Sequence, residues 1–224
     1  MKQQAVPETG RKFRGIPGFS IIEMVVVLGV VFVLAALMLP ALASAKSKAQ
    51  RIHCTSNLKQ VELAFRMWAS DNNDSFPMQV PKEKGGSKEA IEQGQPSLHF
   101  RAISNELGSA KVLYCPSDSR RQAQNFSKLE VENISYFIGV DAEESKPLML
   151  LAGDRNVTNG LPVKNTLLEL PPERDAGWTS ELHRGVGNVG MSDGSVQQLT
   201  MAGLRTSLKK TGDAKNRVQV PEKP

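Results

Sequence analysis

Residues 190–194, Gly-Met-Ser-Asp-Gly, fit the G-x-S-x-G pattern in which some hydrolases hold a nucleophilic serine. In those enzymes a helix follows the serine and the catalytic histidine comes later in the chain. Here a strand-like segment follows, and all three histidines precede Ser192. A chymotrypsin-like order would crowd His183, Asp193 and Ser195 into one short segment. We therefore expect no catalysis, and we expect His183 to hydrogen-bond loop backbone near a hairpin.

Three segments are rich in the oxygen ligands that calcium prefers: residues 70–75, 153–159 and 192–195. No EF-hand spacing is present, and turn and cap chemistry explains Asp and Asn in these places equally well. A calcium site therefore stays an open alternative, with no other cofactor expected. Its candidate ligands are Asp154, Asn156 and Asp193.

The chain contains two cysteines, Cys54 and Cys115, which allow at most one disulfide and no four-thiolate zinc site. Cys54 lies on a predicted helix and Cys115 at the end of a predicted strand, so a bridge between the two elements is one alternative. Two buried free thiols are the other, because the sequence does not show whether the Cα atoms lie within about 7 Å.

The net charge is +5 over 224 residues, but the first 18 residues carry +3 of it. The remaining chain is nearly neutral, whereas a nucleic-acid binder clusters its basic groups on the folded surface. We expect no nucleic-acid partner. The sequence also contains no Walker lysine motif and no Rossmann fingerprint, so the chain is not an ATPase motor.

Residues 19–42 form a run of 24 residues with one charge, Glu23. A helix of this length measures roughly 36 Å, enough to cross a hydrocarbon core of about 30 Å. An ordinary secretory signal peptide cleaved after Ala45 is the alternative, but the run is longer than a signal h-region and carries an acid. Basic residues flank both ends, so charge bias alone does not set the topology.

Beyond this segment, residues 43–70 continue without Gly or Pro, and apolar residues recur at steps of three and four. This spacing predicts an amphipathic helix that packs on a domain. Lys59, Glu62 and Arg66 are assigned to its solvent face. The span and its extension together form one long helix in which Pro40 is expected to introduce a bend. The predicted buried residues are Cys54, Leu58, Val61, Phe65 and Trp68.

The remaining chain is predicted to be a compact α+β domain over residues 71–209, followed by a flexible tail over 210–224. Strands are expected at 111–115, 134–140 and 147–153. Residues 187–191 and 195–199 flank Ser-Asp-Gly, which suits a tight hairpin turn. Thr200 is expected to cap a last helix through Leu208. The predicted fold is a long N-terminal helix on a small antiparallel sheet.

The junction Gly18-Phe19-Ser-Ile-Ile-Glu23-Met, followed directly by the apolar run, resembles the type IV pilin-like superfamily. Precursors of this family carry a basic leader, a Gly, an aromatic first mature residue and a Glu at mature position five. Pro40, at the twenty-second mature position, matches the bend seen in many pilins. The resemblance implies that residues 1–18 are a leader that a prepilin peptidase removes on the cytoplasmic side, after which Phe19 is N-methylated.

This resemblance implies a single-pass protein of a bacterial inner membrane with a periplasmic head. A carboxylate inside hydrocarbon costs several kcal/mol unless it is paired. The freed amine of Phe19 on a neighbouring subunit could pair with Glu23, and methylation keeps that positive charge.

Further along, His183-x9-Asp193-Gly194 and the segments around both cysteines resemble the pilin-like group named for an H-x9-DG pattern, generally described as type II secretion proteins. The implied function is a pseudopilin that assembles with other pseudopilins, served indirectly by an assembly platform and an ATPase. The alternatives are a minor type IV or DNA-uptake pilin, and a ligand-binding or enzymatic domain anchored by a pilin leader.

Overall fold

The computed structural model describes residues 18–222. The chain divides into two compact units, Met1–Ser44 and Ala45–Pro224. The predicted leader lies outside the described residues except for Gly18, and the last two residues of the predicted tail lie outside them as well.

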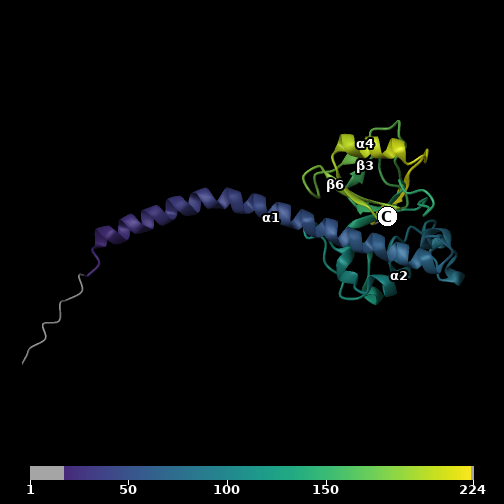
Figure 1. The fold of residues 1–224 in the computed structure, drawn as a ribbon, viewed down its shortest axis with the longest axis horizontal. Coiled ribbons are helices and arrows are strands. Elements are labelled where there is room, and N and C mark those ends of the chain that lie inside the picture. The colour runs from purple at the N-terminus through teal and green to yellow at the C-terminus, as the bar shows by residue number, and fades with distance from the viewer. Residues whose placement is uncertain (1–17, 223–224) are drawn as a thin grey trace, which may run out of the picture. The chain divides into compact units, whose positions relative to one another are not determined.

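Helix α1 (Ile21–Asp71) begins in the first unit and ends in the second, with Pro40 inside it. In the first unit every residue from 18 to 44 is exposed, and the helix is long and apolar enough to cross a membrane (Figure 1). The predicted apolar helix is therefore confirmed.

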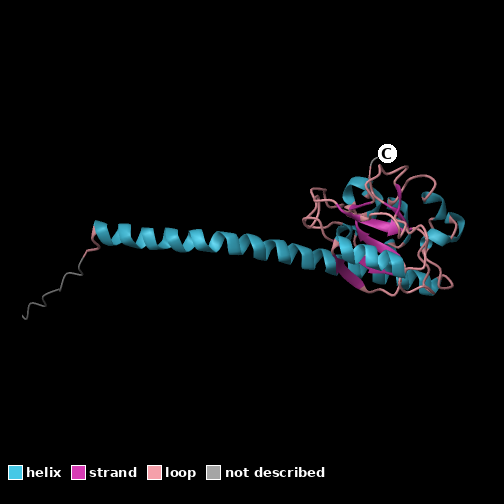
Figure 2. Ribbon diagram, turned by 90° about the horizontal axis from the view of Figure 1, so that it is seen from above, coloured by secondary structure: helices cyan, strands magenta, loops and turns pink. Residues whose placement is uncertain are grey.

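The second unit is built on an antiparallel sheet of six strands in the order β4-β8-β1-β2-β6-β7. A separate pair, β3 and β5, forms a two-stranded sheet, and Figure 2 shows the strands grouped in this unit. The strands are β1 (Tyr136–Gly139), β2 (Leu150–Asp154), β3 (Val157–Thr158), β4 (Leu167–Glu169), β5 (Gly177–Trp178), β6 (Gly187–Met191), β7 (Val196–Leu199) and β8 (Arg217–Gln219).

Apolar side chains cover both faces of the sheet, because successive residues of a strand point to opposite sides. Tyr136 and Ile138 of β1 join the core beneath α1, whereas Phe137 joins the core on the other face. Helix α4 (Met201–Lys210) closes this second core with Leu204 and Leu208, and Figure 1 shows α4 and α1 on opposite sides of β6. The predicted α+β architecture is confirmed.

The carboxyl-terminal part of α1 buries the predicted stripe, with Cys54, Leu58, Val61 and Phe65 fully inaccessible and Trp68 nearly so. Each such large side chain contributes about 1.5–3 kcal/mol through burial. The helix therefore packs as its spacing predicts.

The remaining helices are short. They are α2 (Ser97–Ala102), α3 (Ser104–Leu107) and six 3-10 turns at Pro77–Gln79, Lys82–Lys84, Lys88–Ala90, Ala110–Leu113, Phe126–Lys128 and Val131–Asn133. The strand expected at 111–115 is therefore wrong. Ser109 accepts a hydrogen bond from the Lys111 N–H and so starts a 3-10 turn there.

The flexible tail expected over 210–224 is also wrong. Strand β8 pairs with β1 on one side and β4 on the other. Val218 and Val220 enter the second core, while Gln219 points to a buried hydrogen-bond network. This alternation of apolar and polar residues is typical of a strand and outweighs the polar composition of the segment.

Candidate functional site

The amino-terminal end of α1 contains the residues predicted for processing and assembly. Gly18 and Phe19 precede the helix, which begins at Ile21. The Ser20 backbone N–H donates to Oε2 of Glu23 over 2.8 Å, so the carboxylate caps the first turn of its own helix. A negative charge is favourable there because the helix amino terminus carries partial positive charge.

The apolar side chains on both sides of Glu23 in the sequence are not covered by any other described residue. Phe19 is 74% exposed and Phe32 is 75% exposed, and every Val, Leu, Ile and Met from 21 to 42 is at least half exposed. Such an apolar surface is far larger than soluble monomers expose, and it marks a contact with lipid or with other proteins.

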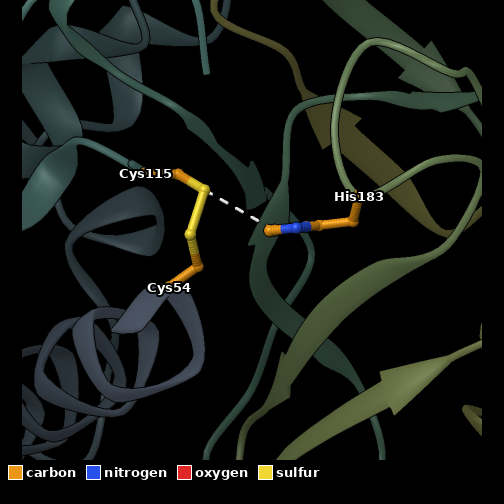
Figure 3. Close-up of side chains that lie close together, drawn as sticks. All are labelled: Cys54, Cys115 and His183. Atoms are coloured by element: carbon orange, nitrogen blue, oxygen red, sulfur yellow. Dashed lines mark hydrogen bonds between the residues drawn. A yellow bond between two sulfur atoms is a disulfide. The ribbon is translucent and has the colours of Figure 1, made fainter. Parts of the chain in front are cut away.

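A second candidate site lies inside the second unit, where His183 faces a disulfide (Figure 3). Cys54 of α1 and Cys115 are bonded, with their Cα atoms 5.1 Å apart. The bridge ties α1 to the loop after the 3-10 turn at Ala110–Leu113, so the disulfide alternative is the one that the structure contains. Nε2 of His183 lies 3.5 Å from Sγ of Cys115.

Asp154 completes this buried cluster at the end of β2. Its Oδ2 lies 3.4 Å from Nε2 of His183 and accepts hydrogen bonds from the backbone N–H and the side-chain amide of Asn188. Burial raises the pKa of Asp154 to about 7, although the Asn188 hydrogen bonds lower it in part. Burial and the nearby Arg51 charge lower the pKa of His183 to about 4.

The expectation that the His183 ring would hydrogen-bond loop backbone is wrong. The ring faces the disulfide and Asp154 instead, and it is the His183 carbonyl that accepts a hydrogen bond, from Arg51 of α1. The side chains of His183 and Asp154 are 1% and 0% exposed, so the cluster is closed to solvent. His183 also has a φ of 50°, which lies in the left-handed region of backbone conformation.

The H-x9-DG segment runs along α1, and its two ends have different contacts. Arg51 holds the His183 end, while Nη1 of Arg66 donates to the Asp193 carbonyl over 2.8 Å at the other end. The predicted hairpin turn is confirmed, since Met191 N–H donates to the Ser195 carbonyl across it. The motif therefore fixes strand β6 to the helix at both ends.

The three calcium candidates do not converge on one site. Asp154 ends β2, whereas the Asp193 N–H donates to the Pro147 carbonyl beyond the other end of that strand. The five residues of β2 separate the two by roughly 13 Å. Asn156 is engaged elsewhere, because its amide donates to the carbonyls of Thr179 and Leu182.

Glu62 is the clearest residue that sequence reasoning missed. It was assigned to the solvent face of α1, but it is fully buried against Gly190 of β6. Neither carboxyl oxygen makes a hydrogen bond of normal geometry within residues 18–222. Burial raises the pKa of Glu62 well above its usual range. The sequence did contain one indication of this burial: Glu62 lies four residues after Leu58, and residues four apart lie on the same face of a helix.

Ser192 is fully buried in the hairpin turn and its hydroxyl faces the Met149 carbonyl at 3.4 Å. Strand β7 follows it, so the strand–turn–helix context of a nucleophilic serine is missing at this position. No protein-family model matches the sequence, and no curated protein or solved structure matches it significantly.

Proposed function

We propose that the chain is a pseudopilin, a structural subunit of a type II secretion pseudopilus. A prepilin peptidase cuts after Gly18, Phe19 becomes N-methylated, and the apolar part of α1 then anchors the subunit in the bacterial inner membrane. The observation that carries this proposal is the exposure of every side chain from 18 to 44, with Glu23 as the only charge in residues 19–42. This surface must be covered by lipid before assembly and by neighbouring helices after it.

Glu23 supplies the register of assembly in this proposal. Within residues 18–222 it has no cationic partner, and its carboxylate interacts only with the Ser20 N–H at its own helix terminus. Removing a carboxylate from water without a counter-charge costs several kcal/mol. The amine created at Phe19 of the next subunit provides that charge, so cleavage and assembly are coupled.

Subunits that stack in this way make head-to-tail contacts that do not close, and such contacts generate filaments. The second unit would then be the periplasmic head. Its partners are the prepilin peptidase, other pseudopilins and, indirectly, the assembly platform and its ATPase.

Coexpression with a prepilin peptidase tests the first step. Intact-mass spectrometry should show a chain shortened by 18 residues that begins with methylated Phe19. Gly18→Val should block the cut, because a side chain then occupies the position before the scissile bond. Gly29→Val is the matched control, since no atom lies within 4 Å of a Cβ at either glycine. A protein that keeps Met1, or that begins at Lys46, would contradict the proposal.

The second step is tested by expressing the processed chain together with a complete secretion system and isolating sheared filaments. The subunit should be found in the filament fraction, and it should leave that fraction when the assembly ATPase is deleted. A subunit that stays in the membrane under both conditions would mean that the apolar helix serves only as an anchor.

A further inference from the structure

Three potential metal ligands converge in the closed cluster of the second unit: the sulfurs of Cys54 and Cys115 and Nε2 of His183 (Figure 3). The Asp154 carboxylate is a fourth candidate, because its Oδ2 lies 3.4 Å from Nε2 of His183. The two sulfurs and the imidazole nitrogen all lie within 4.8 Å of one another. We propose that the dithiol form of the protein binds Zn²⁺ here, through these four side chains. This proposal is independent of the pseudopilin function.

Two of the six ligand–ligand distances match those of a tetrahedral zinc site. With Zn–S, Zn–N and Zn–O bonds of about 2.3, 2.05 and 2.1 Å, a tetrahedron places sulfur and nitrogen roughly 3.5 Å apart, and nitrogen and oxygen roughly 3.4 Å apart. The structure has 3.5 Å between Sγ of Cys115 and Nε2 of His183. It has 3.4 Å between Nε2 of His183 and Oδ2 of Asp154. Both distances are therefore close to the tetrahedral values already in the disulfide form.

The surroundings balance the charge of a bound ion. Two thiolates and one carboxylate carry three negative charges against the two positive charges of zinc. The guanidinium of Arg51, which donates to the His183 carbonyl, supplies the remaining positive charge. Asn188 donates twice to Oδ2 of Asp154 and so orients that ligand, as outer-shell donors do in zinc proteins. Oδ1 of Asp154 is buried without a hydrogen bond in the described part of the chain.

The metal and the disulfide exclude each other. A tetrahedral site needs the sulfurs roughly 3.8 Å apart, so they cannot be bonded. The dithiol exists before the disulfide forms, or after a thiol or phosphine reductant has supplied two electrons and two protons have been taken up. Rotation about the two Cα–Cβ bonds then separates the sulfurs. Binding then involves no redox step, because each thiol loses a proton and the thiolate coordinates the ion. Zinc bound before oxidation would therefore delay formation of the disulfide.

The test uses the full chain in detergent, reduced with a phosphine under anaerobic conditions and titrated with Co²⁺, followed by displacement with Zn²⁺. One equivalent should bind with a sulfur-to-cobalt charge-transfer band and the intense visible absorption of tetrahedral cobalt. His183→Gln and Asp154→Asn should each weaken binding by at least about 10-fold, because the loss of a direct ligand should cost no less than the loss of an outer-shell partner. The oxidised protein should not bind.

His53→Gln is the matched control, because His53 is adjacent to Cys54 in the sequence but exposed. It should leave the affinity unchanged. Equal losses for His53→Gln and His183→Gln would show chelation by the local His-Cys sequence and would overturn the proposal. Absence of the charge-transfer band in the reduced wild type would also overturn the proposal. So would an equal Co²⁺ affinity of the reduced wild type with and without urea, because the site would then not depend on the fold. These two measurements use the wild type, so they decide the question even if a variant does not fold.

Discussion

The two parts of α1, residues 21–44 and 45–71, are continuous in sequence but differ in how their apolar side chains are buried. The first part is apolar on all sides and exposed throughout, whereas the second buries one apolar stripe, from Cys54 to Trp68, in the core beneath it. Each part also contains one anomalous carboxylate, Glu23 or Glu62. The comparison shows that helical structure alone does not determine what covers a helix. The second part packs on the rest of its own unit, whereas no residue from 18 to 222 covers the first.

The largest expected effect concerns the carboxylate of the first part. Glu23→Ala should leave cleavage after Gly18 intact but reduce the amount of subunit in sheared filaments at least about 10-fold, because the Phe19 amine loses its counter-charge. Immunoblots of membrane and filament fractions measure this. Glu62→Ala is the matched control in the same helix. If Glu23→Ala entered filaments normally, the charge-pair mechanism would be wrong.

Leucines of the two parts should differ in their effect on the stability of the second unit. Leu58→Ala should lower the free energy of unfolding by about 2–5 kcal/mol, since Leu58 is fully buried in the core beneath α1. Leu28→Ala should not change it, because Leu28 is 61% exposed. Urea unfolding of the full chain in detergent can be followed by Trp68 and Trp178 fluorescence. Comparable losses in the two variants would remove the distinction.

A smaller effect on the free energy of unfolding is expected from two glycines: Gly190 of β6, which packs against the second part of α1, and Gly29, which lies in the first part. A Cβ added to Gly190 would clash with Oε1 of Glu62, so Gly190→Ala should cost about 1–3 kcal/mol. The cost should shrink in a Glu62→Ala background, where the carboxyl is absent. Gly29→Ala is the control, because nothing lies within 4 Å of a Cβ there. A double-mutant cycle by urea unfolding measures the coupling, and a coupling of zero would mean that the two residues do not oppose each other.

The smallest effect is the pH dependence contributed by Glu62. The unfolded chain ionises this carboxyl near its ordinary pKa of 4.5, whereas burial keeps it protonated in the folded protein to higher pH. The unfolded state therefore binds fewer protons, and stability falls as pH rises through this window. Glu62→Gln should match the wild type near pH 4 and be more stable near pH 8, by at least about 1 kcal/mol, because each unit by which the pKa is raised is worth about 1.4 kcal/mol.

Urea midpoints across this pH range measure that difference, and Leu28→Ala, which removes no ionisable group, is the control that should keep the wild-type slope. An identical slope for Glu62→Gln would show that Glu62 is ionised when buried.

Much of this protein was determined by sequence alone. The uniform apolar run and the later stripe from Cys54 to Trp68 define the two parts of α1. A helix that buries only one face shows apolar residues at helical spacing, whereas a helix in apolar surroundings on all sides shows an uninterrupted apolar run. The Asp-Gly turn and the Thr200 cap were also predicted, since both depend on local backbone chemistry. The Thr200 hydroxyl does accept from the Gly203 N–H.

Only the tertiary structure decided the rest, because these contacts join residues far apart in the chain. The sequence allowed a Cys54–Cys115 bridge but did not show whether the Cα atoms approach, and it gave no sign that His183 and Asp154 meet beside it. The polar residues 210–224 looked flexible until β1 and β4 supplied partners for β8. Glu62 looked solvated because helical periodicity ranks positions by their neighbours along the helix, whereas burial depends on the strand that packs across it.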